Sequence, residues 1–166
     1  MRPLFALGFI TCTSLMAIAL YLQHVNGLEP CPLCILQRVA VIALGVIFLI
    51  AALHNPRTLG QRVYGLLIML TATAGAGVAG RHVWLENLPK DRVPTCGPSL
   101  DYMLETLPFK RTLELVLRGS GECAEVTWRM LGLSIPSWTL IAFAGFFLFG
   151  AYLLFQRKRK SGLRFS

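Results

Sequence analysis

The sequence predicts an all-α membrane protein, a bundle of four transmembrane helices. Of its 166 residues, 55% are hydrophobic, whereas a soluble domain has about 45–50% apolar residues. Four long segments, 4–22, 35–53, 63–80 and 135–155, each contain at most one charged residue. A helix of this length crosses a hydrocarbon core of about 30 Å at about 1.5 Å per residue. Only helices satisfy the backbone in lipid at this span length.

The first span, 4–22, has some features of a secretory signal peptide. Arg2 precedes it, and Ala17-Ile18-Ala19 resembles a cleavage site. The apolar core of a signal peptide is about 7–15 residues long, whereas this segment continues to Leu22. The length therefore favours an uncleaved membrane anchor.

The charges predict the orientation of a single integral-membrane domain, 1–166, with net charge +8. With a cytoplasmic N-terminus, the segments 1–3, 54–62 and 156–166 hold basic residues and no acidic ones. The outer loops, 23–34 and 81–134, then hold every acidic residue. The positive-inside rule favours this arrangement, so we expect both termini in the cytoplasm.

A sequence pI of about 9.7 is also found among nucleic-acid-binding proteins. Here, however, the basic tail Arg157–Lys160 directly follows the last span. Basic residues in that position anchor and orient a helix against anionic lipid. We therefore expect the lipid bilayer as a partner and no nucleic acid.

The long loop, 81–134, contains one segment with helical periodicity. The first part of this loop is rich in proline, so we expect residues 88–98 to be extended. Within Phe109–Arg118, apolar residues recur at the spacing i, i+3, i+4: Leu113, Val116 and Leu117. This pattern predicts a short amphipathic helix on the bilayer surface. The alternative is a helix packed on the loop's own core.

The third span is rich in small residues between Ala72 and Gly80. Small residues let helix backbones approach closely in lipid. They would also leave room for a flat ligand near the outer end of the span. The sequence alone favours close packing.

Two cysteines, Cys31 and Cys34, form a C-x-x-C pair where an outer loop meets the second span. Such a pair is usually a redox dithiol or half of a metal site. As a structural disulfide it would close a very short loop, which constrains the unfolded chain little. At a helix start the dipole stabilises thiolate, and Pro32 suits a first helical turn. These features favour thiol–disulfide exchange.

The other cysteines are Cys12, Cys96 and Cys123. Cys12 lies within the first span, where an apolar environment leaves a thiol inert, so we interpret it as a packing residue. Cys96 and Cys123 share the outer face with the C-x-x-C pair. Two structural disulfides are one alternative for these four thiols, and a zinc site is another. Zinc is disfavoured because Cys96 and Cys123 do not form a second C-x-x-C pair, so we expect no metal.

Two polar residues accompany the dithiol. Arg38 follows Cys34 by four residues, on the same helix face and one turn deeper. It either extends to the headgroups or stabilises an anion, such as the Cys34 thiolate or a reduced ligand, and the dithiol favours the second role. His82, with Arg81 beside it, ends the third span at the same level. It is either a proton relay or an ordinary interface residue.

With these features in place, the chain resembles the disulfide-bond formation protein B family, DsbB, over nearly its whole length. Three motifs carry the resemblance, namely Cys31-Pro32-Leu33-Cys34-Ile35-Leu36-Gln37-Arg38, Pro94-Thr95-Cys96, and Gly121-Glu122-Cys123-Ala124 with Trp128, Leu131-Gly132-Leu133 and Pro136-Ser137-Trp138. Gln37 occupies a position that is acidic in some members, so we assign it no proton role.

The resemblance implies a bacterial inner-membrane thiol:quinone oxidoreductase that reoxidises the periplasmic dithiol oxidase DsbA. By analogy, Cys96 forms the mixed disulfide with DsbA, and Cys123 is its disulfide partner. The Cys31–Cys34 disulfide then reoxidises that pair. Cys34 passes electrons to ubiquinone, or to menaquinone without oxygen, with Arg38 assisting and His82 on the quinone side.

Two other interpretations of the sequence are considered. Enzymes of the vitamin K epoxide reductase type are also small helical bundles with a C-x-x-C motif, but they usually carry it near the end of the chain. The second is a non-enzymatic tetraspan protein with two inert disulfides. It predicts that Cys31 and Cys34 resist reduction by a DsbA-like dithiol.

Overall fold

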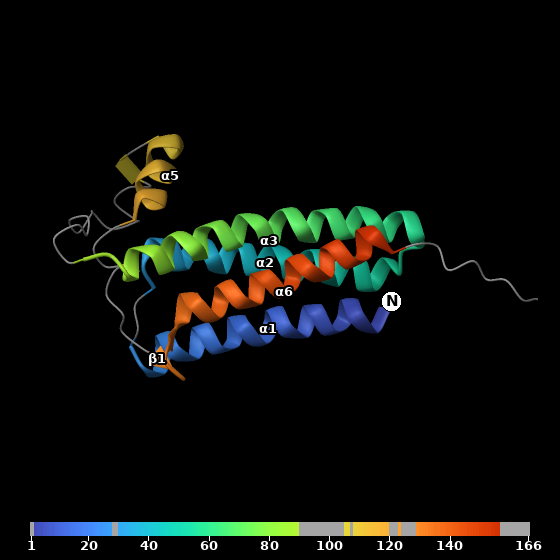
Figure 1. The fold of residues 1–166 in the computed structure, drawn as a ribbon, viewed down its shortest axis with the longest axis horizontal. Coiled ribbons are helices and arrows are strands. Elements are labelled where there is room, and N and C mark those ends of the chain that lie inside the picture. Colours follow the sequence, from blue (N-terminus) through green and yellow to red (C-terminus); the bar gives the residue numbers. More distant parts are fainter. Residues whose placement is uncertain are drawn as a thin grey trace, which may run out of the picture.

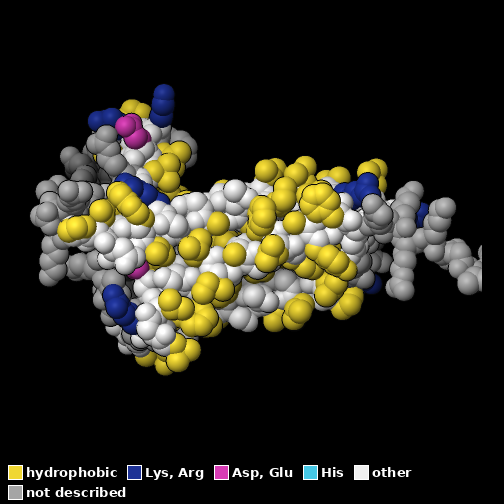
Figure 2. Space-filling view, in the orientation of Figure 1, with side chains coloured by type: hydrophobic (Ala, Val, Ile, Leu, Met, Phe, Trp, Pro, Cys, Tyr) yellow, Lys and Arg dark blue, Asp and Glu magenta, His cyan; other side chains and the backbone are white. Residues whose placement is uncertain are grey.

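Four long helices form the bundle: α1 (Arg2–Val25), α2 (Pro32–His54), α3 (Thr58–Glu86) and α6 (Ile135–Phe155) (Figure 1). All four are long and apolar enough to cross a membrane. The computed structural model describes residues 2–27, 30–89, 105–106, 108–119, 123 and 129–156. The predicted four-helix membrane fold is confirmed. Hydrophobic side chains cover the middle of the visible face, and charged ones lie toward its ends (Figure 2).

The turn between α2 and α3 follows from the local sequence. Asn55 caps α2 in the left-handed conformation, with φ 45°, and its N–H binds the carbonyl of Ala51. Pro56 follows, and proline cannot continue a helix. At the same end of the bundle, Arg2 Nε donates to the carbonyl oxygen of Ala52 at 3.1 Å. The start of α1 is thereby attached to the end of α2.

Helices α3 and α6 approach until their backbones touch. A Cβ added at Gly65 would lie 2.9 Å from the carbonyl oxygen of Gly150, and one at Gly150 would lie 2.7 Å from that of Gly65. Farther along, Gly75 faces the ring of Phe143. The Gly75 contact agrees with the packing interpretation of the small residues between Ala72 and Gly80, whereas Gly77 and Gly80 have no atom within 4 Å of an added Cβ.

An aromatic cluster joins the four helices in the half of the bundle near Arg2. The ring of Phe5 meets that of Phe149 edge to face, at 6.2 Å between centroids. Phe48 lies 5.5 Å from Phe146 and 5.8 Å from Phe149. Tyr64 of α3 completes the cluster against Phe5 at 6.4 Å. Both Phe5 and Phe48 are almost fully buried, so this cluster fixes the relative positions of the helices.

A short helix, α5 (Phe109–Arg118), lies across the opposite end of the bundle (Figure 1). Its Thr112 and Val116 are buried, whereas Leu113 and Leu117 are 37% and 42% exposed. The predicted apolar face of α5 is therefore only partly covered by the protein. Val116 packs on the protein, and the two leucines remain open to the surroundings.

A small antiparallel hairpin, β1 (Arg129–Met130) and β2 (Leu133–Ser134), precedes α6. Its turn residues, Leu131 and Gly132, have φ of 53° and 82°, as a two-residue hairpin turn requires. The sequence analysis missed this hairpin. Ser134 Oγ donates to Glu86 Oε2 at 2.5 Å, which connects the hairpin to the end of α3.

Several predicted features lie outside the described residues. They include Cys96, most of the expected extended segment 88–98, and the basic tail Arg157–Lys160.

The helix contact at Gly150 predicts a matched difference in stability. Alanine generally favours a helix over glycine by about 1 kcal/mol, but at Gly150 the added methyl overlaps α3, and overpacking costs about 1–3 kcal/mol. Gly77 has no atom within 4 Å of an added Cβ. We expect Gly150→Ala to lower the thermal unfolding midpoint in detergent and Gly77→Ala to leave it unchanged or raise it. Equal midpoints for the two variants would contradict the close α3–α6 contact.

Candidate functional site

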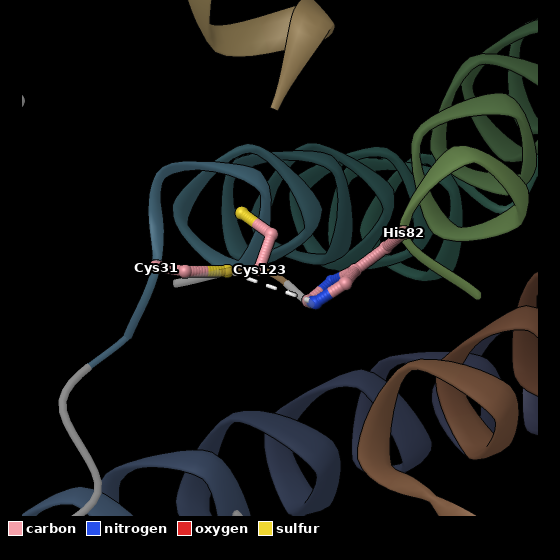
Figure 3. A group of neighbouring side chains, drawn as sticks. All are labelled: Cys31, His82 and Cys123. Carbon is pink, nitrogen blue, oxygen red and sulfur yellow. Dashed lines mark hydrogen bonds between the residues drawn. The ribbon is translucent and has the colours of Figure 1, made fainter. Parts of the chain in front are cut away.

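Three buried side chains meet at the end of the bundle that carries α5 (Figure 3). Cys31 precedes the first turn of α2, His82 belongs to the last turns of α3, and Cys123 comes from the loop before the hairpin. One ligand atom from each lies within 4.8 Å of the other two. The structure thus brings together three of the site residues predicted from the sequence.

Cys31 and Cys34 form a close thiol pair. Their Sγ atoms are 3.2 Å apart, longer than the roughly 2.05 Å of a disulfide bond. A shift of about 1 Å would bring the two sulfurs to the distance of a disulfide bond. Cys31 is the N-cap residue of α2, and Pro32 begins the helix. Pro32 loses no helical hydrogen bond in that position, so the motif starts the helix and places both thiols in or beside its first turn.

His82 lies against this thiol pair. Its Nε2 is 3.8 Å from Cys31 Sγ, and its Nδ1 is 3.9 Å from Cys34 Sγ. The Gln37 side-chain nitrogen is 3.1 Å from His82 Nδ1. When this amide donates to Nδ1, the proton of a neutral ring is on Nε2 and faces Cys31. Gln37 and His82 are only 5% and 4% exposed, so the hydrogen bond fixes a ring that water barely reaches.

Cys123 packs beside the dithiol on an apolar support. It is fully buried, together with Leu33 of α2 and Leu85 of α3. Its Sγ lies within 4.8 Å of Cys31 Sγ, so a movement of at most about 3 Å would bring the two sulfurs to bonding distance. Thiol–disulfide exchange requires this kind of access of one sulfur to another.

Arg38 is directed toward α1. Its Nη1 donates to Gln23 Oε1 at 2.6 Å, and its Nη2 donates to the carbonyl of Ala19 at 3.2 Å. Both acceptors are formally neutral, and no carboxylate of the described residues forms an ion pair with Arg38. The guanidinium therefore keeps its positive charge available at the α1–α2 boundary, one turn below Cys34.

The structure separates the two polar residues at the end of α3. Arg81 stacks on Trp84, with its guanidinium carbon 4.2 Å from the ring centroid, and Trp84 is half exposed. His82 points the other way, into the thiol cluster (Figure 3). Arg81 thus has the surroundings of an interface residue, and His82 has those of a site residue.

Cys12 lies apart from this cluster. It is 3% exposed and belongs to the main apolar core, where an added Cβ at Gly45 would be 3.4 Å from its own. These surroundings agree with its interpretation as a packing residue.

Two apolar grooves of about 340 Å³ each flank α1. One runs between α1 and α2 and includes Leu20, the residue after the Ala19 carbonyl that binds Arg38. The other runs between α1 and α6. Only the α1–α2 groove approaches Arg38, since the other lies along the half of α1 that begins at Leu4.

The sequence analysis did not predict the contact of Gln37 with His82, having only assigned Gln37 no proton role, and it did not identify Gln23. The signal for Gln37 was a polar residue in an apolar span, three positions after Cys34 and so on the same helix side. Gln23 follows the first predicted span and carried no comparable signal, because its role depends on how α1 packs against α2.

The comparisons with known proteins identify the family of this chain. A family model described as "Disulfide bond formation protein DsbB" matches residues 1–153. The chain belongs to the DsbB family. A relative from Nitrosococcus oceani, named "Disulfide bond formation protein B", is 56% identical over 161 residues, covering 97% of this chain and 94% of the relative. One of the same name from Marinobacter nauticus is 53% identical over 156 residues, covering 94% and 93%.

The proximity of Cys31 and Cys123 predicts a specific cross-link. In a variant with Cys34→Ser and Cys96→Ser, mild oxidation should join Cys31 to Cys123, because the two sulfurs are already within 4.8 Å. Peptide mapping by mass spectrometry without reduction would detect the bond. Cys12 serves as the internal control, since it belongs to a different buried cluster. Efficient pairing of Cys12 with either cysteine would contradict the arrangement.

Proposed function

We propose that this chain is a thiol:quinone oxidoreductase of the bacterial inner membrane. It takes electrons from a reduced DsbA-type thioredoxin-fold protein in the periplasm and delivers them to membrane ubiquinone, or to menaquinone without oxygen. In this way it maintains disulfide formation in secreted proteins. Family membership and the four apolar helices support a multi-pass membrane protein of disulfide formation.

The observation that carries the proposal is the position of Cys31 between two other thiols. On one side it contacts Cys34 at 3.2 Å, and on the other it lies within 4.8 Å of Cys123. A sulfur placed in this way can exchange bonds with both neighbours. It can therefore connect a cysteine of the long loop to the cysteine nearest Arg38.

The sequence of exchanges combines these neighbours with the roles that the family resemblance implies for Cys96 and Cys123. In the oxidised protein, we place disulfides at Cys31–Cys34 and Cys96–Cys123. The reduced partner attacks Cys96, forms a mixed disulfide, and leaves as an oxidised protein, so Cys96 and Cys123 become thiols. The Cys123 thiolate then attacks Cys31, forms a Cys31–Cys123 bond, and releases Cys34 as a thiolate.

The relay is completed when Cys96 attacks Cys123 and restores the loop disulfide, which releases Cys31 as a thiol. Two electrons and two protons then remain on Cys31 and Cys34. A quinone held beside the dithiol would take up these two electrons and two protons. Cys31 and Cys34 would then return to the disulfide, with one disulfide made in the partner.

Residues around the dithiol fit a quinone. Arg38 provides a half-buried cation without a carboxylate partner among the described residues, which would stabilise negative charge on a reduced ring or on the Cys34 thiolate. His82 contacts both thiols and can hold or deliver a proton. The groove between α1 and α2, which includes Leu20, would accommodate an apolar tail.

The membrane orientation is part of the proposal. Arg2 and the α2–α3 turn lie at one end of the bundle, and the thiol cluster with α5 lies at the other. We place the first end, with both chain termini, in the cytoplasm, and the loops 23–34 and 81–134 in the periplasm. The exposed Leu113 and Leu117 of α5 would then contact the bilayer surface.

The two other interpretations are not favoured. The family match supports neither a vitamin K epoxide reductase-type enzyme nor a tetraspan protein with inert disulfides.

Thiol trapping in membranes tests the direction of electron flow. After addition of a reduced DsbA-type protein to quinone-depleted membranes, Cys31 and Cys34 should accumulate as thiols, since they have no acceptor. Added ubiquinone should return them to the disulfide. Alkylation followed by mass analysis measures both states. The proposal fails if the thiol state of Cys31 and Cys34 does not respond to quinone.

Charge at Arg38 should affect the quinone step alone. Arg38→Met removes the cation, and losing a hydrogen bond to a charged group costs about 1.5–3 kcal/mol, or roughly 10–100-fold in quinone reduction. Arg38→Lys should retain much of the rate. Mixed-disulfide formation with the partner should stay normal in both variants. Steady-state quinone reduction and a single-mixing exchange assay separate the steps, and equal losses in both assays would contradict this role.

A further inference from the structure

The described residues contain one group of three buried side chains with metal-ligand chemistry: Cys31, His82 and Cys123. We propose that the reduced form of this protein binds a thiophilic divalent cation, with Zn²⁺ as the type, between these three residues. The sequence analysis disfavoured zinc because it considered a site of four cysteines that included Cys96. In the candidate site of the structure, His82 of α3 is a ligand and Cys96 is not.

The distances suit tetrahedral zinc. Zn–S bonds are about 2.3 Å and Zn–N bonds about 2.0–2.1 Å, so ligand atoms around tetrahedral zinc are about 3.5–3.8 Å apart. Cys31 Sγ already lies 3.8 Å from His82 Nε2, and all three ligand atoms lie within 4.8 Å of one another. Shifts of about 1 Å in these side chains would therefore place the three ligand atoms at three corners of a tetrahedron.

The fourth position has a protein donor close by. Cys34 Sγ is 3.2 Å from Cys31 Sγ, so it can take that position, or water can. With water in the fourth position, two thiolates and a neutral imidazole give a divalent cation a complex of zero net charge. A neutral complex suits this site, since an unpaired buried charge is costly and the three residues are at most 9% exposed.

Gln37 provides the support that a metal-bound histidine needs. Such a histidine usually donates its other ring N–H to a carbonyl or carboxylate oxygen. The Gln37 amide lies 3.1 Å from His82 Nδ1. After half a turn of the amide, its oxygen accepts from Nδ1–H, which leaves Nε2 unprotonated and directed toward Cys31.

Binding requires reduced cysteines, because a sulfur in a disulfide is not a thiolate ligand. The ion and disulfide formation therefore exclude each other at Cys31 and Cys123. If the proposed relay is correct, the metal arrests it in the reduced state. The metal binding itself does not depend on quinone or on a protein partner.

The test uses the purified full-length chain in detergent, reduced and then desalted without oxygen. Titration with Co²⁺ should give sulfur-to-cobalt charge-transfer absorption and the strong visible bands of a tetrahedral site, with one ion per chain. Zn²⁺ should displace the cobalt and abolish both signals. The oxidised protein should give neither signal.

Matched variants identify the ligands. His82→Ala and Cys123→Ser should each weaken Co²⁺ binding tenfold or more, and Gln37→Leu should weaken it by about tenfold, as losses in the outer shell do. Cys12→Ser and Cys96→Ser should bind as the unaltered chain does. Circular dichroism of the helical signal checks that each variant is folded. If His82→Ala unfolds, Gln37→Leu still tests the role of His82, through its effect on Co²⁺ affinity.

Three results would overturn the site: weak octahedral cobalt bands alone, unchanged affinity in folded His82→Ala, or loss of binding in Cys96→Ser. No quinone or partner protein is present in the titration. A failure here therefore leaves the proposed relay standing, and a failure of the relay leaves the metal site standing.

Discussion

The contact between His82 and the thiol pair at the start of α2 is the constraint on which this structure depends. It connects the beginning of one membrane helix to the end of the next, with the Gln37 amide 3.1 Å from the imidazole. The two helices run antiparallel through a short turn, so their outer ends are necessarily neighbours. The side chains at those ends are then enclosed by Leu33, Leu85 and Cys123.

The rest of the bundle holds these helix ends in place. Within lipid, helices associate through close packing and hydrogen bonds and not through the hydrophobic effect. The contact of Gly65 with Gly150 fixes α6 on α3. The helix α1 is attached to α2 near both ends, by Arg2 to Ala52 and by Arg38 to Gln23 and Ala19. Arg38 thus has a structural contact in addition to its proposed electrostatic role.

Much of this architecture could be predicted from the sequence. The long apolar segments predict helices, because only helices satisfy the backbone across a bilayer at that length. The C-x-x-C pair before Arg38 indicates redox chemistry. The contact of Gln37 with His82 could not be predicted, since it depends on the rotation of α2 relative to α3. The same is true of Arg38, whose partners come from α1. The hairpin at Leu131 and Gly132 was missed because its strands are only two residues long.

The chemistry of the site follows from its enclosure. Three thiols and an imidazole share a space that water barely enters, so the protein must control which pair of sulfurs bonds at each moment. Arg38 adds a positive charge at the boundary with lipid. In the proposed relay, a loop cysteine, a helix-cap cysteine and a cysteine one turn deeper would form a path from one end of the bundle into its apolar part.

The most direct test of the central claim is a single turnover without Cys31. A reduced DsbA-type protein is mixed with ubiquinone-containing vesicles that hold either the unaltered chain or Cys31→Ser, and quinol is followed by absorbance. The account predicts one quinol for each partner disulfide formed with the unaltered chain and with Cys12→Ser, and none with Cys31→Ser. Quinol formation at the unaltered rate in Cys31→Ser would contradict it.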